Sequence, residues 1–326
     1  MCIVYTYTEP SPSKPVKRAP MPKATAVRAF VPGHITGLFR IHDSAPDTLH
    51  CGSTGAGFSV SLGTTTSVGI QESDSLRIDV EYNGARIDAP VTTTVVRTMV
   101  EQYGGAFSVH VQHQSNLPIG VGFGASGAGA LGAAFSLGMT LDPDMTPTQA
   151  AGFAHSAEVV NHTGLGDVIG QFEGGVEIRV LPGAPGIGRI IRVPYDKSIQ
   201  VVLAGGHGLK AKRAALVDVT WRERINRVAG NLIEEMKASP SISRFIDCSR
   251  HFAEATGLAT ERVRSALNRL DSNGLNQSGM VMLGDSVFCF CDKESTSVAT
   301  EILMQGWDAY EIMVTTVAAK GGRLIR

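Results

Sequence analysis

Residues 117–130, Leu117-Pro-Ile-Gly-Val-Gly-Phe-Gly-Ala-Ser-Gly-Ala-Gly-Ala, constrain the fold more than any other stretch of the chain. They follow the alternating segment 107–113, which is typical of a strand, and lead into 128–137, a small and apolar segment that predicts a tightly packed helix. A strand, a turn with almost no side chains and a helix start expose backbone N–H groups and the positive end of the helix dipole. Such a turn is suited to bind an anion, and phosphate is the usual one.

Other uses of a glycine-rich turn fit the sequence less well. The spacing Gly122-x-Gly124-x-x-Gly127 matches the dinucleotide-binding fingerprint, but that unit needs a second strand ending in an acidic residue, and here a turn at 140–147 and another helix follow. A Walker loop needs a lysine, which the turn lacks, and Ala128 stands where a hydrolase nucleophile elbow needs glycine. A turn that only lets the helix pack closely is the remaining alternative, but it does not easily explain the hydroxyl of Ser126.

Length and charge exclude several classes of protein. The 326 residues suffice for one large or two medium domains with real cores. A formal net charge of −1 argues against nucleic acid or a membrane surface as partner, and no apolar run approaches the roughly 20 residues of a transmembrane helix. The odd number of cysteines and the lack of a signal-peptide pattern predict reduced thiols in a cytoplasmic protein. The oligomeric state stays open, with a homodimer as one option.

Strand and helix patterns are mixed without a strict βαβ order, which favours an α+β fold. We expect a disordered, proline-rich tail at 1–24, an N-terminal domain at 25–195 and a C-terminal domain at 196–326. The patterns predict strands at 26–31, 57–62, 66–70, 76–82, 86–87, 107–113, 176–180, 188–193, 199–204, 280–283, 286–291, 308–314 and 323–325, and helices at 92–103, 128–137, 147–163, 211–235, 241–255, 260–270 and 295–305.

Glycine is unusually frequent, at 37 of 326 residues, against the roughly 7% of an average protein. The glycines gather in four clusters, at 33–37, 52–63, 120–132 and 164–175. We therefore expect several loops lined by backbone, among them 52–57 and 164–170, to converge on one ligand.

Together these motifs resemble those of the GHMP superfamily of small-molecule kinases, over nearly the whole chain from about Val27. The segment Pro118-Ile-Gly-Val-Gly-Phe-Gly-Ala-Ser-Gly-Ala is similar to the phosphate-binding motif of that family. Pro32-Gly-His-Ile-Thr-Gly-Leu-Phe resembles its first motif, with His34 where many members carry lysine or arginine. Within the superfamily, the chain most resembles the archaeal pantoate kinases. Three features carry this resemblance: His34, the segment 52–57 and a turn at 282–284. A third glycine-rich motif is matched only loosely by 318–323.

The resemblance implies a two-domain α+β fold with the active site in the cleft between the halves. It also implies phosphorylation of pantoate to 4-phosphopantoate by ATP and Mg²⁺, on the archaeal route to coenzyme A. The residues that would contact ATP all belong to the glycine-rich turn: Pro118, Gly120, Gly122, Gly124, Ala125, Ser126 and Gly127. Ser126 and Glu158 would coordinate Mg²⁺. The alternative for Glu158 is an ordinary exposed charge on an alanine-rich helix.

The resemblance places the reacting alcohol beside an aspartate. Asp167 would orient the substrate hydroxyl and remove its proton, although an aspartate between glycines can also simply stabilise a turn. Arg179 would grip the substrate carboxylate through two parallel hydrogen bonds, unless it is a surface residue of an edge strand. The resemblance places His34 and Ser53 near the substrate as well. His155 lies three residues before Glu158 on the same helix face and could therefore line the same pocket and bond to the substrate. For the two histidines a structural role is the alternative.

Two rival functions stay open. A GHMP kinase could act on another small hydroxy acid or alcohol, of the homoserine or mevalonate type. Alternatively, the fold could serve as a non-catalytic protein that binds a nucleotide or metabolite. That second rival predicts loss of the acidic site residues, and both Asp167 and Glu158 are present.

Overall fold

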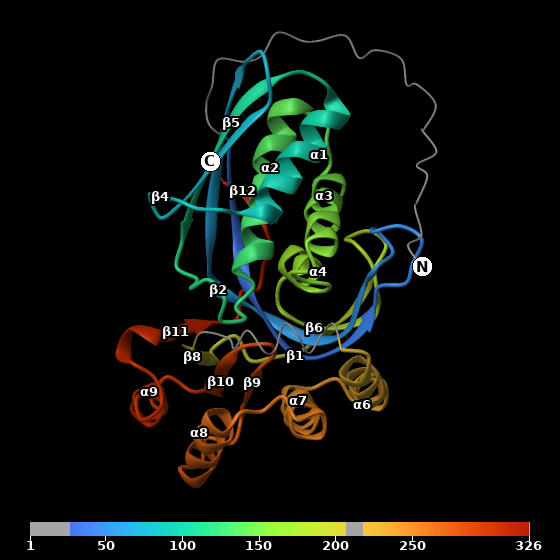
Figure 1. Cartoon of the computed structure of the whole chain (residues 1–326). Helices are drawn as coiled ribbons and strands as arrows, with labels where there is room; N and C mark the ends of the chain where they lie inside the picture. Colours follow the sequence, from blue (N-terminus) through green and yellow to red (C-terminus); the bar gives the residue numbers. More distant parts are fainter. Residues whose placement is uncertain (1–26, 207–217, 326) are drawn as a thin grey trace.

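The computed structural model describes residues 27–206 and 218–325, so the tail predicted at 1–24 lies outside the described residues. Two sheets organise this part of the chain (Figure 1). The large sheet has the strand order β12-β1-β2-β5-β3-β4, with β6 pairing to β2 and β7 to β6, and the small sheet has the order β11-β8-β10-β9. The structure confirms the predicted α+β class.

The large sheet is built on a long antiparallel pair, β1 (Val27–His42) and β2 (Gly52–Glu72). Helices pack on one face of this sheet (Figure 1). Its other strands are β3 (Arg77–Tyr82), β4 (Ala85–Arg86), β5 (Phe107–Ser115), β6 (Val176–Leu181), β7 (Arg189–Val193) and β12 (Arg323–Ile325), and the covering helices are α1 (Pro90–Tyr103), α2 (Ala125–Leu141), α3 (Pro147–Val160) and α4 (Asp167–Glu173). The sheet pairs antiparallel except between β3 and β5.

Two of the four glycine clusters are not loops, which corrects the expectation drawn from composition, whereas the strand predicted at 57–62 is confirmed as part of β2. The clusters at 33–37 and 52–63 lie inside β1 and β2, where the pairing shifts register after Pro32 and again after Thr36. A side chain at Gly55 would collide with the backbone of Leu38, and one at Gly57 with the ring of His34. These glycines therefore permit bulges and a close backbone approach within a strand, a role that composition cannot distinguish from a turn.

The loop predicted at 164–170 is also corrected, because a helix not predicted from sequence, α4, begins at Asp167. Only seven residues long, α4 carries too little periodic pattern to be recognised from sequence. The strand expected at 308–314 starts later, since a 3-10 turn, η1 (Ala309–Glu311), is stabilised by reciprocal hydrogen bonds between Asp308 and Glu311. Each predicted helix has a counterpart, although the first residues of the one expected at 211–235 fall outside the described part.

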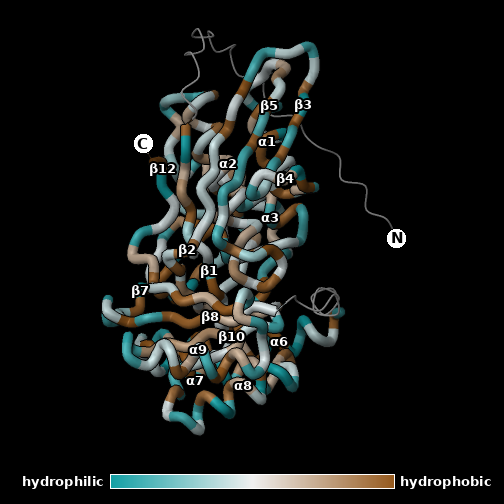
Figure 2. The backbone as a smooth tube through the Cα atoms, turned by 90° about the vertical axis from the view of Figure 1, so that its left-hand side faces the viewer, coloured by the Kyte–Doolittle hydropathy of each residue, from teal (hydrophilic) through white to brown (hydrophobic). Residues whose placement is uncertain are grey.

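The small sheet and its helices form the lower layer in Figure 1, beneath the curved ends of β1 and β2. Its strands are among the hydrophobic segments seen in brown in Figure 2. They are β8 (Gln200–Gly206), β9 (Ser278–Val281), β10 (Asp285–Cys291) and β11 (Ile312–Thr316), and the helices are α6 (Val219–Ala238), α7 (Ile242–Thr256), α8 (Glu261–Ser272) and α9 (Thr296–Leu303). A cluster of phenylalanine rings, including Phe58, Phe245 and Phe288, joins this layer to β2.

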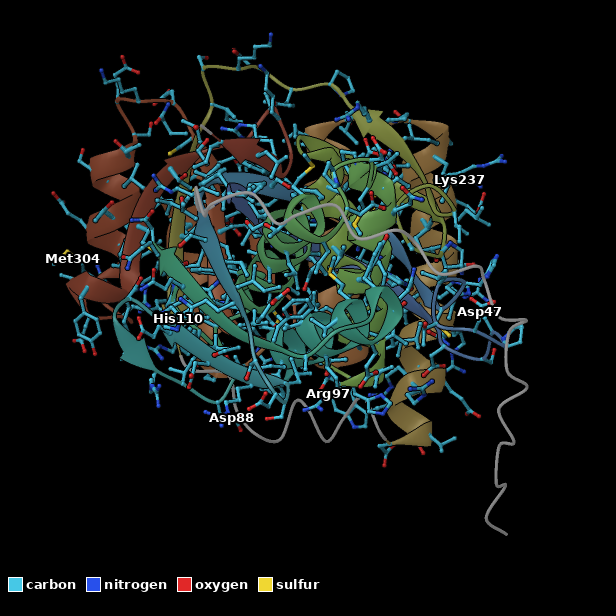
Figure 3. All side chains as sticks on the ribbon, turned by 90° about the horizontal axis from the view of Figure 1, so that it is seen from above. Asp47, Asp88, Arg97, His110, Lys237 and Met304 are labelled. Carbon is cyan, nitrogen blue, oxygen red and sulfur yellow. The ribbon has the colours of Figure 1, made fainter. Side chains whose placement is uncertain are left out.

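The chain returns to the large sheet at its end, where β12 pairs with β1. A domain boundary near residue 195 remains a prediction, since the last strand of the second half belongs to the sheet of the first. Viewed from above, Asp47 in the β1–β2 connection and Met304 after α9 lie on opposite sides of the molecule (Figure 3).

Candidate active site

The glycine-rich turn ends in an uncapped helix. Gly124 precedes α2 in a left-handed conformation, with φ of 72°, and neither a capping side chain nor an acidic residue occupies the first turn. The first hydrogen bond of the helix runs from the amide of Ala128 to the carbonyl of Gly124, at 3.0 Å. The amides that precede it have no partner within the helix, and together with the helix dipole they favour an anion at this end.

Both halves of the protein hold the turn in shape. The side-chain amide of Gln171, in α4, donates to the carbonyls of Pro32 at 3.0 Å and Gly124 at 2.8 Å. From the small sheet, the hydroxyl of Ser286 donates to the carbonyl of Val121 at 2.8 Å. A backbone site for an anion works best when it is held in one shape in advance, and these contacts hold the turn.

Ser126 and Glu158 come together beside this helix end. The exposed Ser126 is the second residue of α2, and its hydroxyl donates to Oε1 of Glu158, in α3, at 2.5 Å. Glu158 is buried, with 2% of its surface exposed, so it is not the exposed helix charge that the alternative required. A methyl group at Gly164 would collide with Oε2 of Glu158, so the glycine leaves room at that oxygen.

This pair fits Mg²⁺, which binds oxygen ligands and usually takes only one or two of them from protein. Among the described residues, no group of three or more histidine, cysteine or acidic side chains gathers to hold a metal. Phosphate oxygens and water would have to complete the coordination.

Asp167 is the first residue of α4 and is held by His34 of β1. Its Oδ1 accepts a hydrogen bond from Nδ1 of His34 at 2.9 Å. The side chain of Asp167 is 29% exposed, whereas that of His34 is fully buried. One carboxylate oxygen is therefore fixed by the protein, and the group as a whole still faces accessible space.

His34 lies between two carboxylates. Its Nε2 is 2.9 Å from Oε1 of Glu177, a residue of β6 with no exposed surface. Burial alone would lower the pKa of His34, but the charge of Glu177 and the hydrogen bonds with Glu177 and Asp167 raise it to about 9. The imidazole is thus a cation at neutral pH, and each ring N–H donates to a carboxylate.

Arg179, also in β6, is buried beside this group. Its Nη1 donates to Oε1 of Glu177 at 2.6 Å. Within the described residues, its other two nitrogens, Nε and Nη2, have no hydrogen-bond partner. The surface-residue alternative for Arg179 is therefore wrong, and a buried edge of the guanidinium offers two donors.

Ser53 lies next to Arg179, in β2. A methyl group at Gly166 would collide with the Ser53 hydroxyl and come within 2.8 Å of Nε of Arg179. Gly166 thus covers the free edge of the guanidinium, and Ser53 belongs to the same cluster as Arg179.

His155 faces another direction. Its Nε2 is 2.9 Å from the carbonyl oxygen of Cys51, the residue before β2. Burial lowers the pKa of His155, partly opposed by hydrogen bonds to the backbone of Cys51 and Thr48. In this structure the histidine fastens α3 to the β1–β2 connection, and a contact with substrate remains a prediction.

Sequence reasoning missed Glu177 and Gln171. Glu177 stands two residues before Arg179 in an otherwise apolar strand, so both side chains point to one face, and that spacing could have suggested a buried pair. Gln171 follows Asp167 by one helical turn, a signal visible only once α4 is known.

The loosely matched third motif also finds its place. The amide of Gly322 donates to the carbonyl of Gln171, and the amide of Gly175 donates to the carbonyl of Ala318. The segment 318–322 therefore packs on the end of α4 and supports the site from behind.

Known proteins resemble this chain over most of its length. The family model of the GHMP kinases N terminal domain matches residues 91–175. Pantoate kinase of Thermococcus kodakarensis is 34% identical over 306 residues, which are 92% of this chain and 99% of that protein. Pantoate kinase of Methanocaldococcus jannaschii is 32% identical over 275 residues, covering 84% and 96%.

Solved structures agree with these matches. A phosphotransferase related to the coenzyme A biosynthesis pathway has a TM-score of 0.83 and 31% identity, covering 93% of this chain and 99% of that one. Homoserine kinase from Cytophaga hutchinsonii has a TM-score of 0.69 at 14% identity, covering 95% and 100%, and that likeness concerns the fold alone. None of the described helices is long and apolar enough to cross a membrane.

Proposed function

The chain belongs to the GHMP kinase family, and on that premise we propose that it transfers the γ-phosphate of ATP to the hydroxyl of pantoate, giving 4-phosphopantoate. Membership of this family makes the chain an ATP-dependent small-molecule kinase. The choice of substrate is supported by the relatives that are pantoate kinases, each matched over most of its own length.

The observation that carries the proposal is the buried edge of Arg179. Nε and Nη2 lie side by side on a guanidinium and match the two oxygens of a carboxylate. Both are buried without a hydrogen-bond partner among the residues that the structure describes, a costly state that a bound carboxylate would relieve. Because Arg179 has no exposed surface, the carboxylate can reach it only if the covering segment around Gly166 shifts.

Asp167 would serve as the base. Its Oδ1 is bonded to His34, which leaves Oδ2 to accept the proton of the substrate hydroxyl. The hydroxyl oxygen then bonds to the γ-phosphorus as the bond from that phosphorus to the bridging oxygen of ADP breaks.

The backbone amides of the glycine-rich turn and of the start of α2 would bind the phosphates of ATP. Ser126 and Glu158 would hold Mg²⁺, which when bound neutralises charge on the phosphate oxygens. The protein's part is to keep these groups and the hydroxyl aligned, since phosphoryl transfer needs little covalent help.

The test is ADP release by the full chain with ATP, Mg²⁺ and one hydroxy acid at a time. We expect turnover with pantoate and little with homoserine or mevalonate. Turnover with another acid but not with pantoate would overturn the substrate, and the family would stand. Nucleotide binding without turnover on any acid of a broad panel would favour the non-catalytic rival.

A further inference from the structure

Glu177 connects the two ends of the site. Its Oε1 accepts hydrogen bonds from Nη1 of Arg179 at 2.6 Å and from Nε2 of His34 at 2.9 Å. His34 in turn donates to Asp167 at 2.9 Å. The four side chains thus form a row of alternating charge, from the arginine that faces the proposed carboxylate to the aspartate that faces the proposed hydroxyl.

The sheet is shaped to allow this row. β1 and β6 both pair with β2, on opposite sides of it, so their side chains would normally be separated by a strand carrying side chains of its own. Opposite Glu177 in β2 stands Gly57, whose missing side chain leaves space that the His34 ring fills. Gly170 of α4 closes over the same ring, since a methyl group there would collide with it.

Removing Glu177 would bring two cations into opposition. Nη1 of Arg179 is 3.5 Å from Nε2 of His34, and both are donors when His34 is charged, so the shared carboxylate is what holds them together. Without it, His34 would lose its proton or Arg179 would move away. The charged groups that face the His34 ring are Asp167 from α4 and Glu177 and Arg179 from β6.

We propose that Glu177 is a positioning residue of the kinase: its carboxylate holds His34 and Arg179 side by side and thereby aligns the carboxylate-binding group with Asp167. This inference rests on the proposed function, because it assumes that Arg179 receives the substrate anion. It assigns a task to a buried carboxylate whose hydrogen bonds, among the described residues, go to His34 and Arg179 and not to the glycine-rich turn or the Ser126–Glu158 pair.

The first test is Glu177→Gln in the full chain, which keeps the shape of the side chain and removes its charge. We expect KM for pantoate to rise by about tenfold or more and kcat to fall, with the affinity for an ATP analogue unchanged. We also expect the fall of kcat at alkaline pH to begin at least about one pH unit lower in the variant than in the wild type. The reason is that His34 loses the carboxylate that raises its pKa.

The second test needs no substrate. NMR of the protein labelled at histidine follows the protonation of the His34 ring, and the pKa of His34 should fall in the Glu177→Gln variant. One outcome is that pantoate gives no turnover in the wild type while the pKa of His34 still falls in the variant. In that case the proposed substrate is wrong and the positioning of His34 stands. The kinetic comparison is then made with the acid that does react. An unmoved His34 pKa overturns the inference whatever the substrate.

The matched control is Glu173→Gln, which also removes a carboxylate paired to an arginine. Glu173 ends α4 and bonds to Arg192 at 2.8 Å, but its side chain is 32% exposed and does not touch His34. We expect no change in KM for pantoate, in kcat or in the pH at which kcat begins to fall. Should the Glu177→Gln variant fail to fold, Glu177→Asp keeps the charge and withdraws it by one methylene. That variant should raise KM for pantoate and still lower the His34 pKa, and wild-type values for both would overturn the inference.

Discussion

Nδ1 of His34 lies 2.9 Å from Oδ1 of Asp167, although 133 residues separate them in the chain. His34 belongs to β1 and Asp167 is the first residue of α4. The hydrogen bond therefore connects the long β1–β2 pair to the carboxylate that we propose as the base.

Asp167→Asn should leave binding of an ATP analogue intact and lower kcat by roughly 10²–10⁴-fold, since the amide can still accept from His34 but cannot take the substrate proton. Steady-state ADP release and calorimetric titration with the analogue measure the two effects. Asp74→Asn, on an exposed turn between β2 and β3, is the control. Unchanged turnover in the Asp167 variant would remove this residue from the mechanism.

Glu158→Gln should raise the Mg²⁺ concentration needed for half-maximal activity by about tenfold or more, because Gln keeps the shape but loses an anionic ligand. Activity is measured over a Mg²⁺ series at saturating ATP and acid, with Ser126→Ala expected to act in the same direction. A lowered kcat with an unaltered Mg²⁺ requirement in both variants would argue that the pair does not hold the ion.

Gly166→Ala should raise KM for pantoate by about tenfold or more with little effect on nucleotide affinity, because its methyl group would press on Ser53 and on Nε of Arg179. The control is Gly69→Ala in β2, where the added methyl group finds only one atom within 4.0 Å. The KM values of the two variants and the wild type are obtained from initial rates over a series of pantoate concentrations. Equal KM values in the variant and the wild type would mean that the acid binds away from Arg179.

The charge of His34 should make stability depend on pH. A pKa raised from 6.5 to about 9 means that the folded protein holds this proton more tightly than the unfolded chain. The resulting stabilisation, of order 3 kcal/mol, is complete below about pH 6.5 and is lost as the pH rises through about 9. Urea unfolding between pH 6 and 10 should show this fall in the wild type. In His34→Gln the same interval should lack it, and equal slopes in both proteins would contradict the raised pKa.

Local sequence was enough to predict a glycine-rich turn between a strand and a helix. A strand, a run of glycines and an apolar helix are adjacent in the chain, so their order alone sets the geometry that exposes the amides before Ala128. The α+β class and most helices follow in the same way from periodicity, which reports which face of a segment is buried.

Only the tertiary structure decided what the other glycines do and which charges meet. Gly55 proved to be a strand residue, because a close approach between β1 and β2 demands the same missing side chain as a turn. The row that runs through Glu177 joins β6 to β1 and α4, and periodicity within a segment carries no information on which distant segment packs against it. Sequence spacing could place Arg179 and Glu177 on one face of a strand, but burial by packed neighbours is what turns that face into a site.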